Sequence, residues 1–352
     1  MSPLQITAES LEARDVLSDK STMAQRMEAF RDIMPAAAPH LLVNPGDAGA
    51  EKHSDCIPEV GNDQLSVDIL RTALAEHGAL IVRGMFSTAE TDALTHVIDR
   101  VFETASAPMR VRAELVSPFF SPPHNLKTIM PNKQQELTRL RIFNDACGGI
   151  MAVEAPSVAE ALLQFYEEHG IKELVGAYLG EPPCLSAKKW VLRRSKLPVD
   201  AGGWHQDGAF MGTDINSLNL WIPLTECGGE TGAPGMDVVP KRLYDIATAE
   251  GAAFDWSVSD EHIQGGAFEA RSVAPVFHAG DAFFFDHLYL HRTQSRTDFT
   301  RVRYAIETWF FGETTFPKDQ VPILWRSPPP APAPQRWWHA VTPKFLRGRS
   351  RI

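Results

Sequence analysis

The sequence predicts a mainly β fold with flanking helices, in which the core is a double-stranded β-helix of the jelly-roll or cupin-like type. Helical periodicity dominates the first half of the chain. After Leu185 it gives way to short β-type runs separated by Gly, Pro and Asp. Many short strands of this kind are typical of β-sandwiches and barrels. The 352 residues, 44% hydrophobic and 22% charged, also have the composition of a globular chain with a large core.

The chain divides into three predicted parts. Residues 1–62 form an N-terminal extension of helix and loop, with a helical stretch at 21–33, and residues 63–312 form the main domain. Residues 313–352 form a basic C-terminal extension with eight prolines, a density that prevents regular helix and sheet pairing. We interpret it as an extended segment laid over the domain; the alternative is a partner-binding or subunit-wrapping arm. Either extension is compatible with a homo-oligomer.

The elements of the main domain follow from local signals. Residues 78–84 form a short apolar run bounded by glycine, which predicts a buried strand. Ser87 and Glu90 make a capping box that opens an amphipathic helix, and a second helix is expected at 157–178, before Gly180. The later strands are expected at residues 186–194, 218–224, 237–239, 282–290 and 301–311.

Charge and composition exclude several classes of protein. The net charge of −10 argues against a nucleic-acid binder, which needs a basic surface to displace counterions from phosphates. No apolar run reaches the roughly 18 residues of a membrane helix, and the first residues do not resemble a signal peptide. The four cysteines form no CxxC pair, so reduced thiols are expected. The sequence therefore predicts a cytoplasmic enzyme with a small-molecule substrate.

A His-x-Asp motif opens the β-rich half of the chain. His205 and Asp207 would face the same way on a strand, because residues two apart lie on one face. A second histidine from a distant strand would complete a 2-His-1-carboxylate triad, which leaves open positions on an iron(II) ion. His53 and Asp55 have the same spacing, but they lie in a Gly/Pro-rich loop ahead of any expected strand. We therefore favour His205 and Asp207 as ligands.

Three histidines compete for the remaining ligand position. His287 and His291 share one face of the expected strand 282–290 and its continuation, so spacing alone does not choose between them. His278 precedes the turn that opens this strand.

On the earlier strand 218–224, alternation places the leucines on one face and Trp221 on the opposite face, towards the lumen of the barrel.

This ordered set of motifs resembles the phytanoyl-CoA dioxygenase family of iron(II)- and 2-oxoglutarate-dependent oxygenases, over about residues 65–312. The matching stretches are residues 78–103, Trp204-His-Gln-Asp-Gly, Asn219-Leu-Trp-Ile-Pro-Leu, Gly280-Asp through His291-Arg-Thr, and Arg301-Val-Arg303-Tyr-Ala-Ile. The resemblance implies that His205, Asp207 and His291 hold Fe(II), with Thr293 close by. His287 then becomes a lumen-facing residue beside the substrate.

The same resemblance implies the cosubstrates 2-oxoglutarate and O₂. It assigns the far carboxylate of 2-oxoglutarate to Arg303, with Arg301 in reserve, and places Trp221 nearby. A guanidinium suits this task because it donates two parallel charge-assisted hydrogen bonds. The cationic run 188–194 is either an anion-binding face or a set of edge residues that extend into solvent, and we favour the edge. Pro240-Lys241-Arg242 stands where many relatives have Pro-Gly-Ser-His, so contacts of that loop do not transfer.

The function implied is hydroxylation, or another oxidation of an unactivated C–H bond, in a medium-sized organic molecule, with release of succinate and CO₂. A biosynthetic tailoring step fits this chemistry, and the carboxylate of Asp207 leaves no ligand position for a halide. The expected pocket residues are Phe210, Met211, His287, Tyr289 and the loop 124–144. The alternatives are a cupin-like metal-dependent isomerase or epimerase that does not use 2-oxoglutarate, and a non-catalytic ligand-binding barrel.

Overall fold

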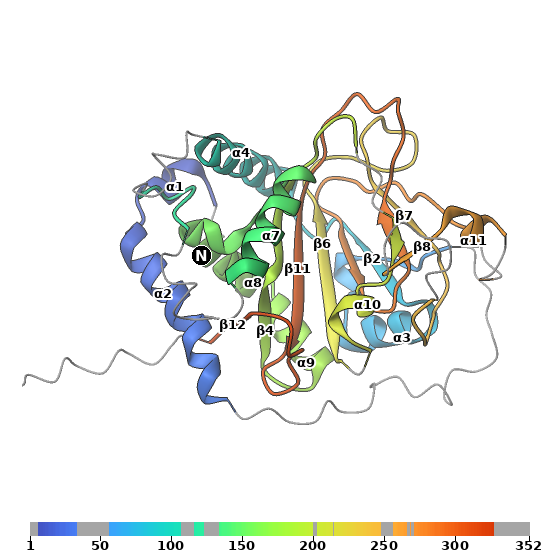
Figure 1. The fold of residues 1–352 in the computed structure, drawn as a ribbon, viewed down its shortest axis with the longest axis horizontal. Helices are drawn as coiled ribbons and strands as arrows, with labels where there is room; N and C mark the ends of the chain where they lie inside the picture. The colour runs from blue at the N-terminus through green and yellow to red at the C-terminus, as the bar shows by residue number, and fades with distance from the viewer. Residues whose placement is uncertain are drawn as a thin grey trace, which may run out of the picture.

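Two β-sheets form the centre of the molecule in the computed structural model (Figure 1). The structure describes residues 6–33, 56–106, 116–122, 134–199, 203–213, 215–247, 256–265, 268 and 271–326. Within this part, the major sheet has the strand order β1-β2-β9-β6-β11-β4-β12, with β3 paired to β4, and the minor sheet has the order β7-β10-β5-β8. This arrangement confirms the predicted mainly β core with flanking helices.

The first four strands belong to the major sheet, and from β5 onward the chain passes back and forth between the two sheets. They are β1 (Glu59–Gly61), β2 (Ala79–Arg83), β3 (Gly149–Met151), β4 (Pro183–Arg194), β5 (Trp204–His205), β6 (Ser217–Pro223), β7 (Met236–Val238), β8 (Ser257–Val258), β9 (Ala282–Phe285), β10 (His291–Thr293), β11 (Tyr304–Gly312) and β12 (Pro322–Leu324). All pairs are antiparallel except β1 with β2. The long central strands β4, β6 and β11 therefore form a rigid floor for the minor sheet.

Most of the helices cover the outer face of the major sheet. They are α1 (Ala8–Glu12), α2 (Val16–Glu28), α3 (Val67–His77), α4 (Thr88–Ala105), α8 (Pro156–Glu168) and α9 (Ile171–Leu179). Three others lie elsewhere: α7 (Gln134–Ala146) beside β3, and the short α10 (Gly208–Met211) and α11 (Asp260–Gln264) after β5 and β8 of the minor sheet. Figure 1 shows α2, α4 and α8 on one side of the major sheet and β7 and β8 on the other. None of the helices in the described ranges has both the length and the apolar character needed to cross a membrane.

Two helices replace the single one expected at residues 157–178. The chain turns at Gly170, which has φ +65° and begins α9 with a left-handed backbone conformation. Glycine adopts this conformation without a steric cost, so it can end one helix and start the next. The capping box predicted at the start of α4 is present, because Ser87 accepts from the amide of Glu90 and the Glu90 carboxylate accepts in return.

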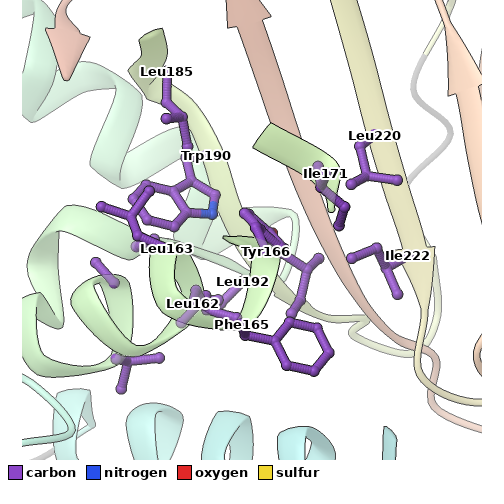
Figure 2. Close-up of a cluster of buried hydrophobic side chains, with 14 of the residues drawn as sticks. Leu162, Leu163, Phe165, Tyr166, Ile171, Leu185, Trp190, Leu192, Leu220 and Ile222 are labelled. Carbon is purple, nitrogen blue, oxygen red and sulfur yellow. The ribbon is translucent and has the colours of Figure 1, made fainter. Parts of the chain in front are cut away.

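The main core lies between α8 and the outer face of the major sheet. Figure 2 shows side chains of α8 and of the sheet, including Leu162, Tyr166, Trp190 and Leu220, packed into one buried cluster. The alternation on β6 explains its two faces: Leu218, Leu220 and Ile222 join this cluster, whereas Trp221 packs in a second cluster on the inner face. Burial of aromatic and aliphatic groups on this scale holds the floor of the barrel in place.

Two sequence-based expectations about strands are wrong. The strand expected at 282–290 ends at Phe285, and the chain then turns before β10 begins in the other sheet. His287 and His291 therefore do not share a strand face, because the turn at Asp286 cancels the two-residue alternation. The cationic strand β4 is not an edge, because it pairs with β11 on one side and with β12 and β3 on the other.

Described parts of both extensions pack on the main domain. Met23 and Met27 of α2 belong to the main core, and β12 adds a strand to the major sheet. The buried Arg26 guanidinium pairs with Glu160 of α8 at 2.8 Å and donates to the backbone carbonyls of residues 324–326. The domain boundaries at 62 and 312 stay a prediction, and the Pro-rich part of the C-terminal extension lies outside the described residues.

Replacing Arg26 should destabilise the fold. Arg26→Met leaves the Glu160 carboxylate and three backbone carbonyls without their buried donor, so the free energy of unfolding should fall by about 3 kcal/mol. Urea denaturation of the two proteins measures this difference. Lys172→Met, which removes an exposed pair with Glu167, is the control and should cost less than about 1 kcal/mol. Equal losses in both variants would contradict the proposed anchoring by Arg26.

Candidate metal and cosubstrate site

Three potential metal ligands converge on the inner side of the minor sheet. His205 ends β5, His291 begins β10, and these residues are direct partners in the antiparallel ladder between the strands. Asp207 follows two residues after His205, at the start of α10. One ligand atom of each side chain lies within 4.8 Å of the others. Among the described residues this is the one group of three such side chains with metal-site spacing.

The backbone orients both imidazole rings in the same way. Nδ1 of His205 lies 2.8 Å from the carbonyl oxygen of Gly203, and Nδ1 of His291 lies 2.8 Å from that of Tyr289. When Nδ1 carries the proton and donates to these carbonyls, Nε2 keeps its lone pair for a metal. Such outer bonds are typical of histidines that bind metals, so the ring orientations fit a divalent ion.

The protonation states of the site also fit a cation. Burial, followed by the neighbouring His291, lowers the pKa of His205 to about 4. Burial alone would raise the pKa of Asp207, but the adjacent Lys189 and the two imidazoles outweigh it and lower that pKa to about 2. Metal ligands must be deprotonated before they bind. His205 and Asp207 are already deprotonated at neutral pH, so neither residue has to release a proton when a metal binds.

Hydrogen bonds join the two ligand-bearing segments to each other. The Gln206 side chain donates to the carbonyl of Leu288 at 2.7 Å, and the amide of Gly208 donates to the carbonyl of His287 at 2.8 Å. Sequence reasoning missed this role of Gln206, which stands between the two ligands of the motif. At the start of the same turn Asp286 pairs with the buried Arg242, the residue that departs from the family pattern.

Several residues expected at the pocket lie outside it. His287 is buried, with Nε2 3.0 Å from the carbonyl oxygen of Thr213 and Nδ1 2.9 Å from the hydroxyl of Ser217, so it does not face the lumen as expected. Tyr289 packs against Phe283 and Phe285 in the second core cluster. Met211, also expected at the pocket wall, is buried in the same cluster. None of the three lines the cavity beside the triad.

A cavity of about 500 Å³ opens between the two sheets at the triad. Phe210, Trp221, Thr293 and Arg303 line it, as the sequence predicted. Asn219, which alternation along its strand also directs to the lumen, lines the cavity as well. Residues that sequence reasoning did not single out line it too, among them Met236, Trp256 and Glu307. Of the expected loop 124–144, the part from residue 134 onward belongs to α7, which contributes Leu140 and Phe143 to the wall.

The cationic strand β4 faces this cavity with Lys188, Lys189 and Arg193. Lys189 lies with Nζ 2.9 Å from Oδ1 of Asp207. These residues correct the interpretation of β4 as a solvent-facing edge. The two-residue alternation that directs Trp221 to the lumen also directs Lys189 and Arg193 there. The position of β4 inside the sheet was not evident from the sequence.

Arg303 is a buried guanidinium without a carboxylate partner. It precedes β11, donates weakly to the carbonyl of Gly235 at 3.3 Å, and lies 5.7 Å from the ring centre of Trp221. Its Nε has no hydrogen-bond partner among the described residues. Burial, together with Arg193, lowers the pKa of Arg303 to about 10. A buried charge without a partner is costly, and the carboxylate of a ligand would relieve that cost.

The other candidates do not join the site. Arg301 lies outside the cavity, with an exposed guanidinium that donates to the carbonyl of Thr231. His278 is exposed and lies beside Glu226. His53 and Asp55 fall outside the described residues, so their rejection as ligands stays a prediction.

The jelly-roll cavity, the His-Asp-His group and the buried arginine define the class of non-haem iron, 2-oxoglutarate-dependent oxygenases. The family model of phytanoyl-CoA dioxygenase matches residues 74–302, more than half of the chain, so this chain belongs to the phytanoyl-CoA dioxygenase family. It is thus an enzyme of the 2-oxoglutarate-dependent dioxygenase type that uses iron. No curated protein matches the chain at a significant level.

Solved structures of similar fold are distant in sequence. EctD from S. alaskensis, determined with 2-oxoglutarate and 5-hydroxyectoine, is 13% identical with a TM-score of 0.49, over 81% of this chain and 86% of that one. The epimerase SnoN, in complex with Fe3+, alpha ketoglutarate and nogalamycin RO, is 14% identical with a TM-score of 0.47, over 70% and 83%. The carbocyclase SnoK is 14% identical with a TM-score of 0.44, over 72% and 87%.

The two histidines flanking the turn before β10 should differ in their effect on metal binding. His291→Ala removes a candidate ligand, so the variant should lose its one equivalent of Fe(II) when it is loaded anaerobically and desalted. His287→Ala is the matched control, since that ring bonds to Ser217 and Thr213 instead, and it should keep the metal. Iron is measured by a colorimetric chelator. Metal lost from His287→Ala but kept by His291→Ala would refute the assignment.

Proposed function

We propose that this enzyme hydroxylates an unactivated C–H bond of a medium-sized organic molecule in a biosynthetic tailoring step. The observation that carries the proposal is the unpaired Arg303 in the same cavity as the His-Asp-His group. Bound iron(II) and 2-oxoglutarate supply the oxidising chemistry with O₂, and release succinate and CO₂. The protein must bind the cosubstrate, hold one C–H bond in place and exclude water.

In this proposal each residue has one task. His205 and His291 present Nε2 to the iron, and Asp207 presents the oxygen that Lys189 does not hold. Arg303 binds the far carboxylate of 2-oxoglutarate through its unpartnered edge. Thr293 and Trp221, which line the cavity as well, flank the chain of the diacid.

The rest of the cavity receives the substrate. Phe210 and Trp256 pack edge to face beside His205, and Phe143 of α7 adds a further aromatic wall. These rings offer apolar surfaces against which an organic substrate could pack. The ionised Asp207 occupies the ligand position that a halide would need, which supports hydroxylation over halogenation.

Arg303 also weighs against the alternative functions. A cupin-like isomerase or epimerase that does not use 2-oxoglutarate has no use for an unpaired buried guanidinium in its lumen. A non-catalytic barrel would not need two imidazoles oriented by backbone carbonyls. None of the four cysteines, all among the described residues, forms a disulfide, which supports a cytoplasmic location. A homo-oligomer through either extension stays a prediction.

Truncating Arg303 should weaken cosubstrate binding and leave the metal in place. Loss of a buried, charge-assisted bond to a carboxylate costs about 2–4 kcal/mol, so Arg303→Ala should raise the dissociation constant of 2-oxoglutarate by roughly 30-fold or more. The measurement is an anaerobic titration of the Fe(II) protein with 2-oxoglutarate, followed at the visible charge-transfer absorption band that an iron–oxoacid chelate gives.

Arg301→Ala is the matched control two residues away. Its guanidinium is exposed and outside the cavity, so the same titration should change little. Absence of the band in the wild-type protein with iron bound would favour the isomerase. A normal titration in Arg303→Ala with a weakened one in Arg301→Ala would move the carboxylate site to Arg301.

A further inference from the structure

The charge of the cavity is opposite to that of the chain. The whole protein carries −10, yet the described residues that line the cavity include five cations against two carboxylates. The cations are Lys188, Lys189, Arg193, Lys196 and Arg303, and the carboxylates are Asp207 and Glu307. The cavity therefore carries an excess of three positive charges.

Loading the site does not remove this excess. Under the proposed function the cavity takes up one Fe(II), with two positive charges, and one 2-oxoglutarate, with two negative charges. These contributions cancel, so the loaded cavity keeps its three positive charges. A cavity of one sign with low-dielectric walls attracts ligands of the other sign. The remaining charge therefore acts on whichever molecule enters next.

Four of the five cations come from β4 and the residues directly after it, and so form one wall of the cavity. Lys189 and Arg193 project from β4, and about a fifth of each side chain remains exposed towards the cavity. Arg193 holds one oxygen of Glu307 through Nε and Nη2, which leaves Nη1 outside this pair. Lys189 pairs with Asp207, and a bound iron would share the negative charge of that carboxylate. The two cations are thus only partly neutralised in the loaded site.

The same wall borders an aromatic surface. Nζ of Lys189 lies 4.3 Å from the centre of the Phe210 ring, and Phe210 contacts Trp256 edge to face at 6.0 Å. A ligand bound here would place an apolar body on the two rings and a negative group on Lys189 and Arg193. An electrically neutral molecule would contact the rings but would gain nothing from the charge of Lys189 or from Nη1 of Arg193, which lies outside the pair with Glu307.

We propose that the substrate is an organic oxyanion with an apolar or aromatic body, and that Lys189 and Arg193 bind its carboxylate or phosphate group. This inference rests on the proposed function, since it takes Arg303 to be occupied by 2-oxoglutarate. Lys188 and Lys196 lie further along the same wall. Lys188 donates to the carbonyl of Asp319, and Lys196 lies 3.8 Å from Asp145 near the surface. They add to the attraction of an anion and do not define the subsite.

Matched acid and amide probes test the charge preference. The Fe(II) protein is saturated with 2-oxoglutarate under anaerobic conditions, so that Arg303 is filled, and is titrated with 3-phenylpropanoate, its neutral amide and phenyl phosphate. Binding is followed by the change in the charge-transfer band. The acid should bind at least about fivefold more tightly than the amide. Comparing 3-phenylpropanoate with phenyl phosphate then shows whether the site prefers a carboxylate or a phosphate. An acid that binds no better than its amide would overturn the inference.

Variants then locate the preference. Lys189→Met and the double variant Arg193→Gln/Glu307→Gln, which leaves no buried charge unpaired, should each reduce the advantage of the acid by about threefold or more and leave the amide unchanged. Lys172→Met, outside the cavity, should change the affinity for neither probe. An unaltered advantage in both cavity variants would also overturn the inference.

Failure of the proposed function gives a different result. If the wild-type protein binds iron but shows no charge-transfer band with 2-oxoglutarate, the dioxygenase assignment falls, whatever the probes do. The acid and amide can then be compared by the fluorescence of Trp256 in the iron-free protein, with Trp256→Phe as the background. A preference for the acid there would still show the charge of the cavity.

Discussion

The site depends on the hydrogen bonds that tie the segment around His205 to the turn before His291. The two ligand histidines come from residues 86 positions apart, and they meet because β5 and β10 are direct neighbours in the minor sheet. The side chain of Gln206 and the amide of Gly208 then fix the turn at residues 287 and 288. Asp286 and Arg242 hold the start of that turn as a buried ion pair. Ligand positions set by backbone bonds are rigid before any metal arrives.

Electrostatic interactions add to the effect of the backbone bonds that orient the ligand side chains. An ionised carboxylate beside a neutral imidazole suits a divalent cation, and Arg303, whose Nε has no partner among the described residues, would suit a carboxylate. The strands β4, β6 and β11 carry the cavity wall on their inner face and pack against α8 on their outer face. Under the proposed function, the cavity of about 500 Å³ holds the metal, the cosubstrate and a cationic wall side by side.

Local patterns predicted much of this from the sequence. The spacing of His205 and Asp207, the alternation around Trp221 and the capping box at Ser87 are each set by a few neighbouring residues, so the sequence carries them directly. The predictions that were wrong depend on contacts between segments far apart in the sequence. An apolar run through residues 282–290 does not reveal that the chain turns at Asp286, because the turn depends on bonds to Arg242 and Gln206 far along the chain. The place of β4 in the sheet depends on β12, more than a hundred residues later.

The most direct test of the proposed site is a crystal structure of the protein with Mn(II) and 2-oxoglutarate, grown without oxygen so that no turnover occurs. Mn(II) should bind Nε2 of His205, Nε2 of His291 and one carboxylate oxygen of Asp207, and the far carboxylate of 2-oxoglutarate should lie on Arg303. A metal bound elsewhere, or an oxoglutarate whose far carboxylate lies away from Arg303, would contradict it.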